Sequence, residues 1–275
     1  MTHHREALGA LMRTPPAQID LAYAALLIAQ EAYPNLDPNP YLAQLDSMAA
    51  ELRSRLRASA GAPKTLQAMN RYLFEEIGFR GNTEEYYDPR NSYLNDVLDR
   101  RVGIPITVSL IYMEVARRLG IELQGVAMPG HFLVKYARRE GQVVIDPFHT
   151  GAVLSAKDLR ERILAAGGKP EEASLYLAAA TKRQIITRML HNLRHIHLAG
   201  RDFDRALGIV EMMLAVSPWD LDAIRDRGLI QYQRHAYSEA LRDLEVYLEY
   251  RPEADDAGSI WESVQTLRPR VSGQE

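Results

Sequence analysis

The stretch "PGHFLVKYARREGQVVIDPF", residues 129–148, holds two apolar runs separated by "RREG". Two short runs of this kind, joined by a few turn-forming residues, predict a β-hairpin. A histidine, His131, opens the first run, and an aspartate, Asp146, closes the second. Because the strands of a hairpin lie side by side, we expect the imidazole and the carboxylate to be neighbours at one end of a small sheet.

The segments before the hairpin extend this prediction to an α+β domain. The run "GIPITVSLIYMEVARRLGI" predicts a helix, with Pro105 at a first helical position and Gly120 as a left-handed stop. "LQGVAMP" then adds a third strand. Apolar residues at helical spacing predict earlier helices within residues 19–33, 41–58 and 65–79.

The last third of the chain repeats itself. Four residue pairs lie 34 positions apart: Phe203 and Tyr237, Ala206 and Ala240, Leu207 and Leu241, and Pro218 and Pro252. This period, with a small residue at the helix crossing and a proline after the second helix, is typical of tetratricopeptide repeats. We expect two repeats, at about 187–220 and 221–254, and a capping helix that ends in a frayed "VSGQE" tail. The predicted domains are therefore 1–178, with the N-terminal helices and the sheet, and an all-α domain at 179–275.

Composition narrows the class of protein. The chain has 275 residues, of which 47% are hydrophobic and 25% charged, as in ordinary globular proteins. A net charge of −3 gives no reason to expect nucleic acid as a partner. Neither a signal peptide nor an apolar run of membrane-spanning length is evident, so we expect a cytoplasmic protein away from membranes. The absence of cysteine excludes disulfides, thiolate metal sites and thiol catalysis, and nothing in the sequence predicts a cofactor.

The blocks "NDVLDRRVGIPI", "PGHFLV" and "DPF" are similar to those of a bacterial family of SirB-type proteins. Members of that family join a transglutaminase-like core to tetratricopeptide repeats, and the resemblance covers about residues 20–270. The family name implies a link to transcriptional control. A related core occurs in a eukaryotic F-box protein.

The resemblance also implies positions for a catalytic triad. In transglutaminase-like enzymes a cysteine stands at the start of the central helix, a histidine opens one strand and an aspartate lies on the next. His131 and Asp146 match the last two, whereas the cysteine position falls near Pro105 or Ile106, which cannot act as nucleophiles. A hydroxyl from Thr107 or Ser109 is the remaining alternative, provided that His131 lies within hydrogen-bond distance of it.

A polar loop precedes the central helix, with the candidate binding residues Tyr86, Tyr87, Asp88, Arg90, Asn91 and Tyr93. One interpretation is a binding rim on a cleft with His131 and Asp146, in which aromatic rings supply contact area. The other is an ordered loop that caps the next helix. In that case Asn95 is the N-cap and Asp96 pairs with Arg100.

Further candidates lie after the hairpin. His149 follows Asp146 and is able to join the His–Asp pair. His191 and His195 share one helix face at i and i+4, the spacing of a zinc-binding pair, but without a nearby carboxylate they remain secondary candidates and no metal is predicted. Together with Arg188 and Arg225 they suggest a repeat groove that binds acidic peptide segments.

These observations favour a non-catalytic or degenerate transglutaminase-like protein that binds a protein or peptide and acts as a regulator. The partner would use the concave face of the repeats and the His131–Asp146 cleft. The alternative is a hydrolase or acyl-transfer enzyme that uses Thr107 or Ser109 with His131 and Asp146. Because two repeats rarely form an independent array, we expect them to pack on the first domain or on a second copy, as in a homodimer.

Overall fold

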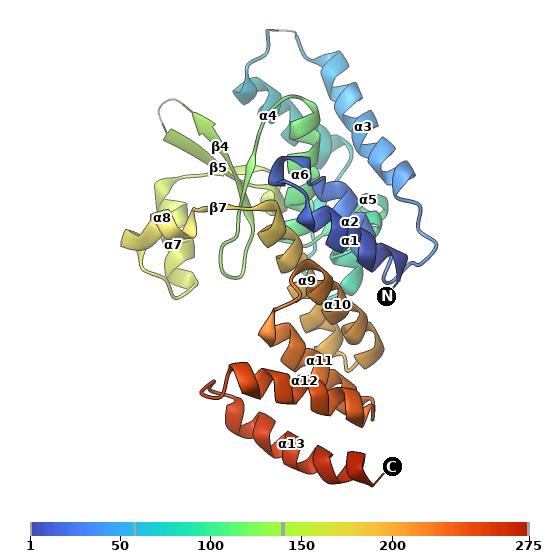
Figure 1. The fold of residues 1–275 in the computed structure, drawn as a ribbon. Helices are drawn as coiled ribbons and strands as arrows, with labels where there is room; N and C mark the ends of the chain where they lie inside the picture. The colour runs from blue at the N-terminus through green and yellow to red at the C-terminus, as the bar shows by residue number, and fades with distance from the viewer. Residues whose placement is uncertain (1, 58, 139–140, 274–275) are drawn as a thin grey trace. The chain divides into compact units, whose positions relative to one another are not determined.

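The computed structural model describes residues 2–57, 59–138 and 141–273 (Figure 1). The chain divides into two compact units. The first, called the sheet unit, comprises residues 15–189. The second, called the repeat unit, comprises residues 1–14 and 190–275, of which 2–14 and 190–273 are described.

The sheet unit contains a five-stranded antiparallel sheet in the order β6-β5-β4-β3-β7. The strands are β3 (Gln124–Val126), β4 (Leu133–Arg138), β5 (Gly141–Asp146), β6 (Ala152–Leu154) and β7 (Ala179–Ala180). The predicted hairpin is confirmed: β4 and β5 pair with Val134 opposite Ile145, and its turn residues Arg139 and Glu140 lie outside the described residues. The short edge strands β6 and β7 were not expected, because two or three residues carry too little periodicity to read from sequence.

Helix α6 (Pro105–Arg118) is the predicted central helix. Pro105 occupies its first turn, where the missing N–H has no helical partner to lose. Gly120 follows its end with φ +81°, the left-handed conformation that glycine adopts most readily. Nearly the whole of α6 is buried, since it contacts α2 and α3 as well as β4. The other helices of this unit include α2 (Leu21–Ala29), α3 (Pro38–Arg55), α4 (Ala62–Asn70), α5 (Leu94–Arg100), α7 (Ala156–Ala165) and α8 (Ala173–Tyr176).

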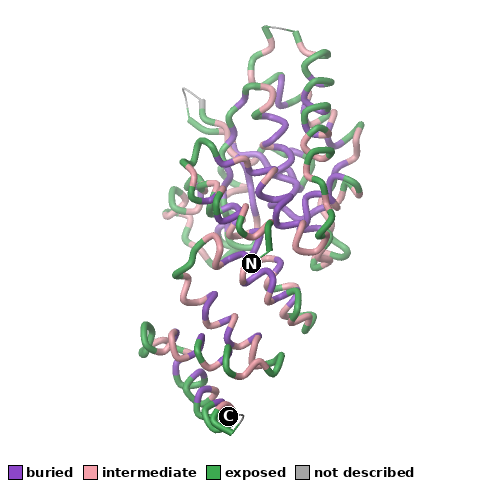
Figure 2. Tube along the Cα trace, turned by 45° about the vertical axis from the view of Figure 1, so that its right-hand side comes forward, coloured by how far each residue is buried: buried purple, intermediate pink, exposed green. Residues whose placement is uncertain are grey.

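Within the sheet unit, α6 is mostly buried, whereas α7 has a single buried residue, Ile163; Figure 2 colours each residue by its burial. One apolar cluster covers the sheet, where Val126, Leu133 and Val144 pack with Ile163 of α7. At another place, β1 (Arg80–Gly81) and β2 (Val102–Gly103) form a short parallel pair just before α6. Among the described residues, none of the helices combines the length and the apolar character that a membrane span requires.

The repeat unit consists of paired helices, as the 34-residue period predicts. They are the end of α9 (Lys182–Ala199), α10 (Phe203–Val216), α11 (Leu221–Gln233), α12 (Tyr237–Tyr250) and α13 (Ala257–Ser272). Ala206 and Ala240 are fully buried, as expected for the small residues of the repeat pattern. The capping helix α13 continues to Ser272, and residues 274–275 of the expected tail lie outside the described residues.

An additional helix joins this unit from the other end of the chain. Helix α1 (His3–Arg13) packs against α10, although sequence alone places these residues with the first domain. The contact is close, since a Cβ atom added to Gly9 would lie 2.8 Å from the carbonyl oxygen of Ala215. No local pattern in α1 identifies its partner, because packing between distant segments depends on tertiary structure.

Candidate functional site

Three side chains converge on one carboxylate oxygen at the end of β5. Asp146 is fully buried, and its Oδ2 lies 2.9 Å from Nε2 of His131 and 2.8 Å from Nδ1 of His149. Nη2 of Arg162, on α7, lies 2.8 Å from the same oxygen. The hairpin register brings the turn before β4 beside the end of β5, which explains the first of these contacts. We call these four residues the Asp146 cluster.

The surroundings of Asp146 keep its carboxylate ionised. Burial by itself raises the pKa of this group, but the hydrogen bonds and positive charge of His131 and His149 outweigh it, so the pKa lies below its ordinary value. Its second oxygen, Oδ1, accepts the backbone N–H of His149 at 3.3 Å. The carboxylate therefore also caps the 3₁₀ turn Pro147–His149, so that part of its role is structural.

The first turns of α6 lie against the segment that carries His131. The Oγ of Ser109 donates a long hydrogen bond of 3.4 Å to the carbonyl oxygen of Phe132, the residue after His131. A buried helix start, a histidine before one strand and an aspartate at the end of the next are thus gathered in one place. This is the arrangement that the resemblance to transglutaminase-like proteins implies.

Comparison with known proteins supports this assignment. Residues 39–191, more than half of the chain, match a family described as "Transglutaminase-like superfamily". The chain belongs to the transglutaminase-like superfamily. Residues 193–265 match a tetratricopeptide repeat family, so a transglutaminase-like domain is followed by tetratricopeptide repeats, as predicted.

Relatives extend over most of the chain. A UPF0162 protein of Xylella fastidiosa is 42% identical over 246 residues, which is 88% of each chain. A UPF0162 protein of Pseudomonas aeruginosa is 34% identical over 219 residues, covering 79% of this chain and 78% of the relative. Human F-box only protein 21 is 37% identical over 138 residues, but these make up 47% of this chain and only 21% of that protein. No solved structure gives a significant match.

The position that the resemblance assigns to the cysteine of transglutaminase-like enzymes carries apolar residues here. Pro105 and Ile106 begin α6 and are both buried. The two hydroxyls that follow are fully buried as well, so neither faces solvent from which a substrate would arrive. The hydroxyl of Thr107 donates to the carbonyl oxygen of Asn91 at 2.8 Å, and its Oγ1 also lies 3.1 Å from the carbonyl oxygen of Ile104. Among the described residues, the Oγ of Ser109 has only its long bond to Phe132.

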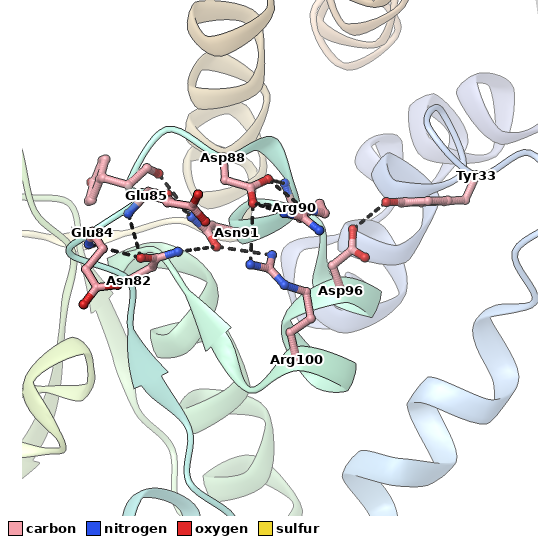
Figure 3. A network of polar contacts seen from close by, with 10 residues as sticks. Tyr33, Asn82, Glu84, Glu85, Asp88, Arg90, Asn91, Asp96 and Arg100 are labelled. Carbon is pink, nitrogen blue, oxygen red and sulfur yellow. Dashed lines mark hydrogen bonds and ion pairs between the residues drawn. The ribbon is translucent and has the colours of Figure 1, made fainter.

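The polar loop before α5 is held mainly by its own polar residues (Figure 3). Asp88 pairs with Arg90 at 2.7 Å and with Arg100 at 3.5 Å. Asn91 is fully buried, and its Nδ2 donates to the carbonyl oxygen of Glu85 at 2.7 Å. Because the carbonyl of Asn91 also accepts the bond from α6, this residue ties the loop to the helix start.

The expected caps of this region differ from those observed. Tyr93, which is buried against Tyr33, is the N-cap of α5, so Asn95 lies inside the helix. Asp96 accepts a hydrogen bond of 2.8 Å from the hydroxyl of Tyr33 instead of pairing with Arg100. The predicted cap and ion pair were based on residues close in sequence, whereas the observed contacts with Tyr33 join residues far apart in sequence.

Three residues of the predicted binding set, Tyr86, Tyr87 and Arg188, remain candidates for binding. Tyr86 is half-buried and Tyr87 is exposed, and their rings meet edge to face with centroids 5.3 Å apart. Arg188, which the sequence suggests for the repeat groove, instead donates a hydrogen bond of 2.9 Å to the carbonyl oxygen of His131. Its charge acts on Tyr86, where it partly offsets the rise in phenol pKa caused by burial. Arg188 thus belongs beside the Asp146 cluster.

The other predicted groove residues lie in the repeat unit. Arg225 pairs with Asp256 at 2.7 Å, with Asp226 at 2.8 Å and with Asp222 at 3.5 Å, so its charge is already compensated. His191 is half-buried, and burial together with nearby Arg194 lowers its pKa. His195 is exposed. In the described part of the chain, neither histidine belongs to a group of three metal-ligating side chains.

Such a group does occur in the Asp146 cluster. One atom each from His131, Asp146 and His149 lies within 4.8 Å of the others, and two imidazoles with one carboxylate suit zinc or iron. The guanidinium of Arg162 on the same carboxylate oxygen opposes a second cation there. Arg162 was missed by sequence reasoning, because an arginine on an amphipathic helix carries no signal of its tertiary partner.

Proposed function

We propose that this protein is a non-catalytic member of the transglutaminase-like superfamily that binds a protein or peptide partner and acts as a regulatory module. One observation carries the proposal. His131 and Asp146 are in contact, the resemblance puts the nucleophile's position near Pro105 or Ile106, and the chain contains no cysteine. A site that retains its walls without its nucleophile is suited to binding rather than turnover.

The contacts of the two hydroxyls support this choice over a hydrolase or acyl-transferase. A serine or threonine nucleophile needs a base within hydrogen-bond reach and a path for its substrate. Thr107 and Ser109 have no exposed surface, and each gives its hydroxyl hydrogen to a backbone carbonyl. Of the described residues, the one that bonds the ring of His131 is Asp146, with no contribution from either hydroxyl.

The second half of the chain supplies the general reason to expect a partner. Tetratricopeptide repeats commonly mediate protein–protein interaction, and residues 193–265 match such repeats. The regulatory part of the proposal rests on the resemblance to SirB-type proteins. In this proposal the partner contacts the concave face of the repeats and the surface around His131.

Two measurements test the proposal. A fluorophosphonate probe, which labels activated hydroxyls, is expected to leave Thr107 and Ser109 unmodified. Labelling of either residue that disappears in a folded His131→Ala variant would overturn the non-catalytic assignment. Proteins captured from the native bacterium by the full chain are then purified and titrated against it by calorimetry. A saturable complex of fixed stoichiometry is expected, and absence of any such complex contradicts the binding role.

A further inference from the structure

We propose that Arg188, with the neutral hydroxyl of Tyr86 as a second donor, forms a binding site beside His131 for a carboxylate group of a protein partner. The inference deepens the proposed binding function and rests on it, because it names the chemistry that the partner must present. It uses side chains of the sheet unit alone. In the described part of the chain, neither Arg188 nor Tyr86 is paired with a carboxylate.

The guanidinium of Arg188 has unused hydrogen-bonding capacity. Arginine carries five N–H donors, and the described residues accept one hydrogen bond from Arg188, at the carbonyl oxygen of His131. No described carboxylate lies within 4.0 Å of the guanidinium. Another neighbour is the ring of Phe132, whose centre lies 6.0 Å from Cζ of Arg188. A half-buried cation without an anionic partner is costly, and a bound carboxylate would offset that cost.

The hydroxyl of Tyr86 is also available to bind a ligand. No described residue bonds this hydroxyl, and Tyr86 lies near enough to Arg188 for the charge of the guanidinium to act on it. Buried side-chain atoms that lack a hydrogen-bond partner are found, among the described residues, in Ser92, Asn95 and Arg194. Because neither Arg188 nor Tyr86 is in that group, their remaining polar atoms keep contact with solvent and are accessible to a ligand.

Charge favours a carboxylate over a phosphate at this place. Burial lowers the pKa of Arg188 from a very high ordinary value, so the side chain stays charged at neutral pH. Burial raises the pKa of Tyr86, so its phenol stays a neutral donor. The site thus offers one uncompensated positive charge, because Arg162 is already paired with Asp146. One charge balances a carboxylate, while a phosphate dianion would leave excess negative charge near Asp146.

Two parts of a protein can present this group: an acidic side chain or the C-terminal carboxylate. The experiment titrates the full chain, labelled at arginine and histidine side chains, and follows the resonances of Arg188 and His131 by NMR. The probes are an acetylated and amidated Ala-Ala-Glu-Ala peptide, an acetylated Ala-Ala-Ala-Ala peptide with a free C-terminus, the Gln-containing amidated peptide and inorganic phosphate.

Saturable shifts are expected with at least one carboxylate peptide and not with the Gln-containing peptide. Arg188→Gln should weaken binding about tenfold or more, and Tyr86→Phe about three- to tenfold. Arg188→Lys keeps the charge but loses the planar fork, so an intermediate loss is expected. Arg183→Gln is the matched control, since Arg183 is an exposed arginine on the same helix and should leave binding unchanged.

The inference is overturned by equal losses in Arg188→Gln and Arg183→Gln, by saturation with phosphate alone, or by no saturable shift in the millimolar range. Its failure is distinguishable from failure of the proposed function. A purified partner that binds wild type and Arg188→Gln equally would leave the binding function standing and remove the carboxylate site. A chain that binds no partner at all would remove both.

Discussion

Arg188 and Arg225 look alike in the sequence, but their surroundings differ. Arg225 of the repeat unit contacts the carboxylates of Asp222, Asp226 and Asp256. Arg188 of the sheet unit reaches only a backbone carbonyl among the described residues. Both side chains are partly buried. The ion pairs of Arg225 stabilise its own unit, whereas the charge of Arg188 is available for the carboxylate ligand proposed above.

This difference separates structural from functional charge. A buried ion pair that loses one member leaves a charge without compensation and destabilises the fold strongly. A charge that has no partner in the folded protein contributes little to stability, and its removal lowers the affinity for a ligand instead. The same reasoning applies to Asp146, which resembles Arg225 in having several partners.

The largest effect is expected when a compensated cluster is broken. Asp226→Ala removes the carboxylate that pairs with both Arg194 and Arg225, and Asp226 is largely buried. We expect a loss of about 3–5 kcal/mol in the free energy of unfolding of the repeat unit. Arg188→Gln, in contrast, should cost about 1 kcal/mol or less, the value of one hydrogen bond.

Urea unfolding followed by far-UV circular dichroism measures both variants. Asp204→Ala serves as the control, because Asp204 pairs with Arg234 at an exposed position and should change stability little. If Arg188→Gln destabilised the chain as much as Asp226→Ala, Arg188 would be a structural residue and the comparison would fail.

The next effect concerns Asp146 and depends on pH. Its pKa in the folded protein is below the ordinary 3.8, so its contribution to stability is present above that value and is lost as pH falls through the folded pKa. Asp146→Asn should cost about 2–4 kcal/mol at pH 7 and progressively less below about pH 4. Unfolding midpoints at several pH values measure this.

Asp46→Asn is the control in the same unit, because Asp46 is exposed and its partner Arg118 keeps a second ion pair, with Glu114, when Asp46 is lost. Its effect on stability should be small at every pH. A constant penalty for Asp146→Asn across the whole range would show that the carboxylate acts through shape rather than charge.

The smallest expected effect tests whether Arg162 prevents metal binding. In the Arg162→Gln variant, the guanidinium no longer occupies Oδ2 of Asp146. This oxygen and the ring nitrogens of His131 and His149 are then free to bind a metal ion. Zinc should then raise the melting temperature of this variant by a few degrees and that of wild type by less. Arg162→Gln combined with His149→Ala should lose the rise, and equal stabilisation of wild type would contradict the assigned role of Arg162.

Much of the fold follows from local sequence patterns. The hairpin, the central helix and the repeats were predictable because period, turn residues and self-similarity are properties of neighbouring positions. The partner of α1 and the short strands β6 and β7 were not, since both depend on segments far away in sequence. Tyr93 replaced Asn95 as the cap of α5 for the same reason: Tyr33 packs against it from another part of the chain.

The candidate site was predictable only in part. The proximity of His131 and Asp146 follows from the hairpin, and the resemblance placed both at the positions of a former triad. From the sequence, binding and structural roles were equally plausible for Asp88 and Asn91. In the structure, both side chains contact other residues of the same loop. Arg188 was a candidate for a different surface, because no pattern in a helix reveals which unit its side chain faces.

Sequence by itself determined what this protein cannot do. Without cysteine, and with Pro105 and Ile106 at the start of the central helix, the thiol chemistry of the superfamily is lost. Tertiary structure decided the surroundings of the remaining groups: it buried Thr107 and Ser109, brought Arg162 to Asp146, and left Arg188 beside His131 with no carboxylate partner among the described residues. The physical reason is that composition fixes which groups exist, whereas compensation of charge depends on which groups folding brings within a few ångströms.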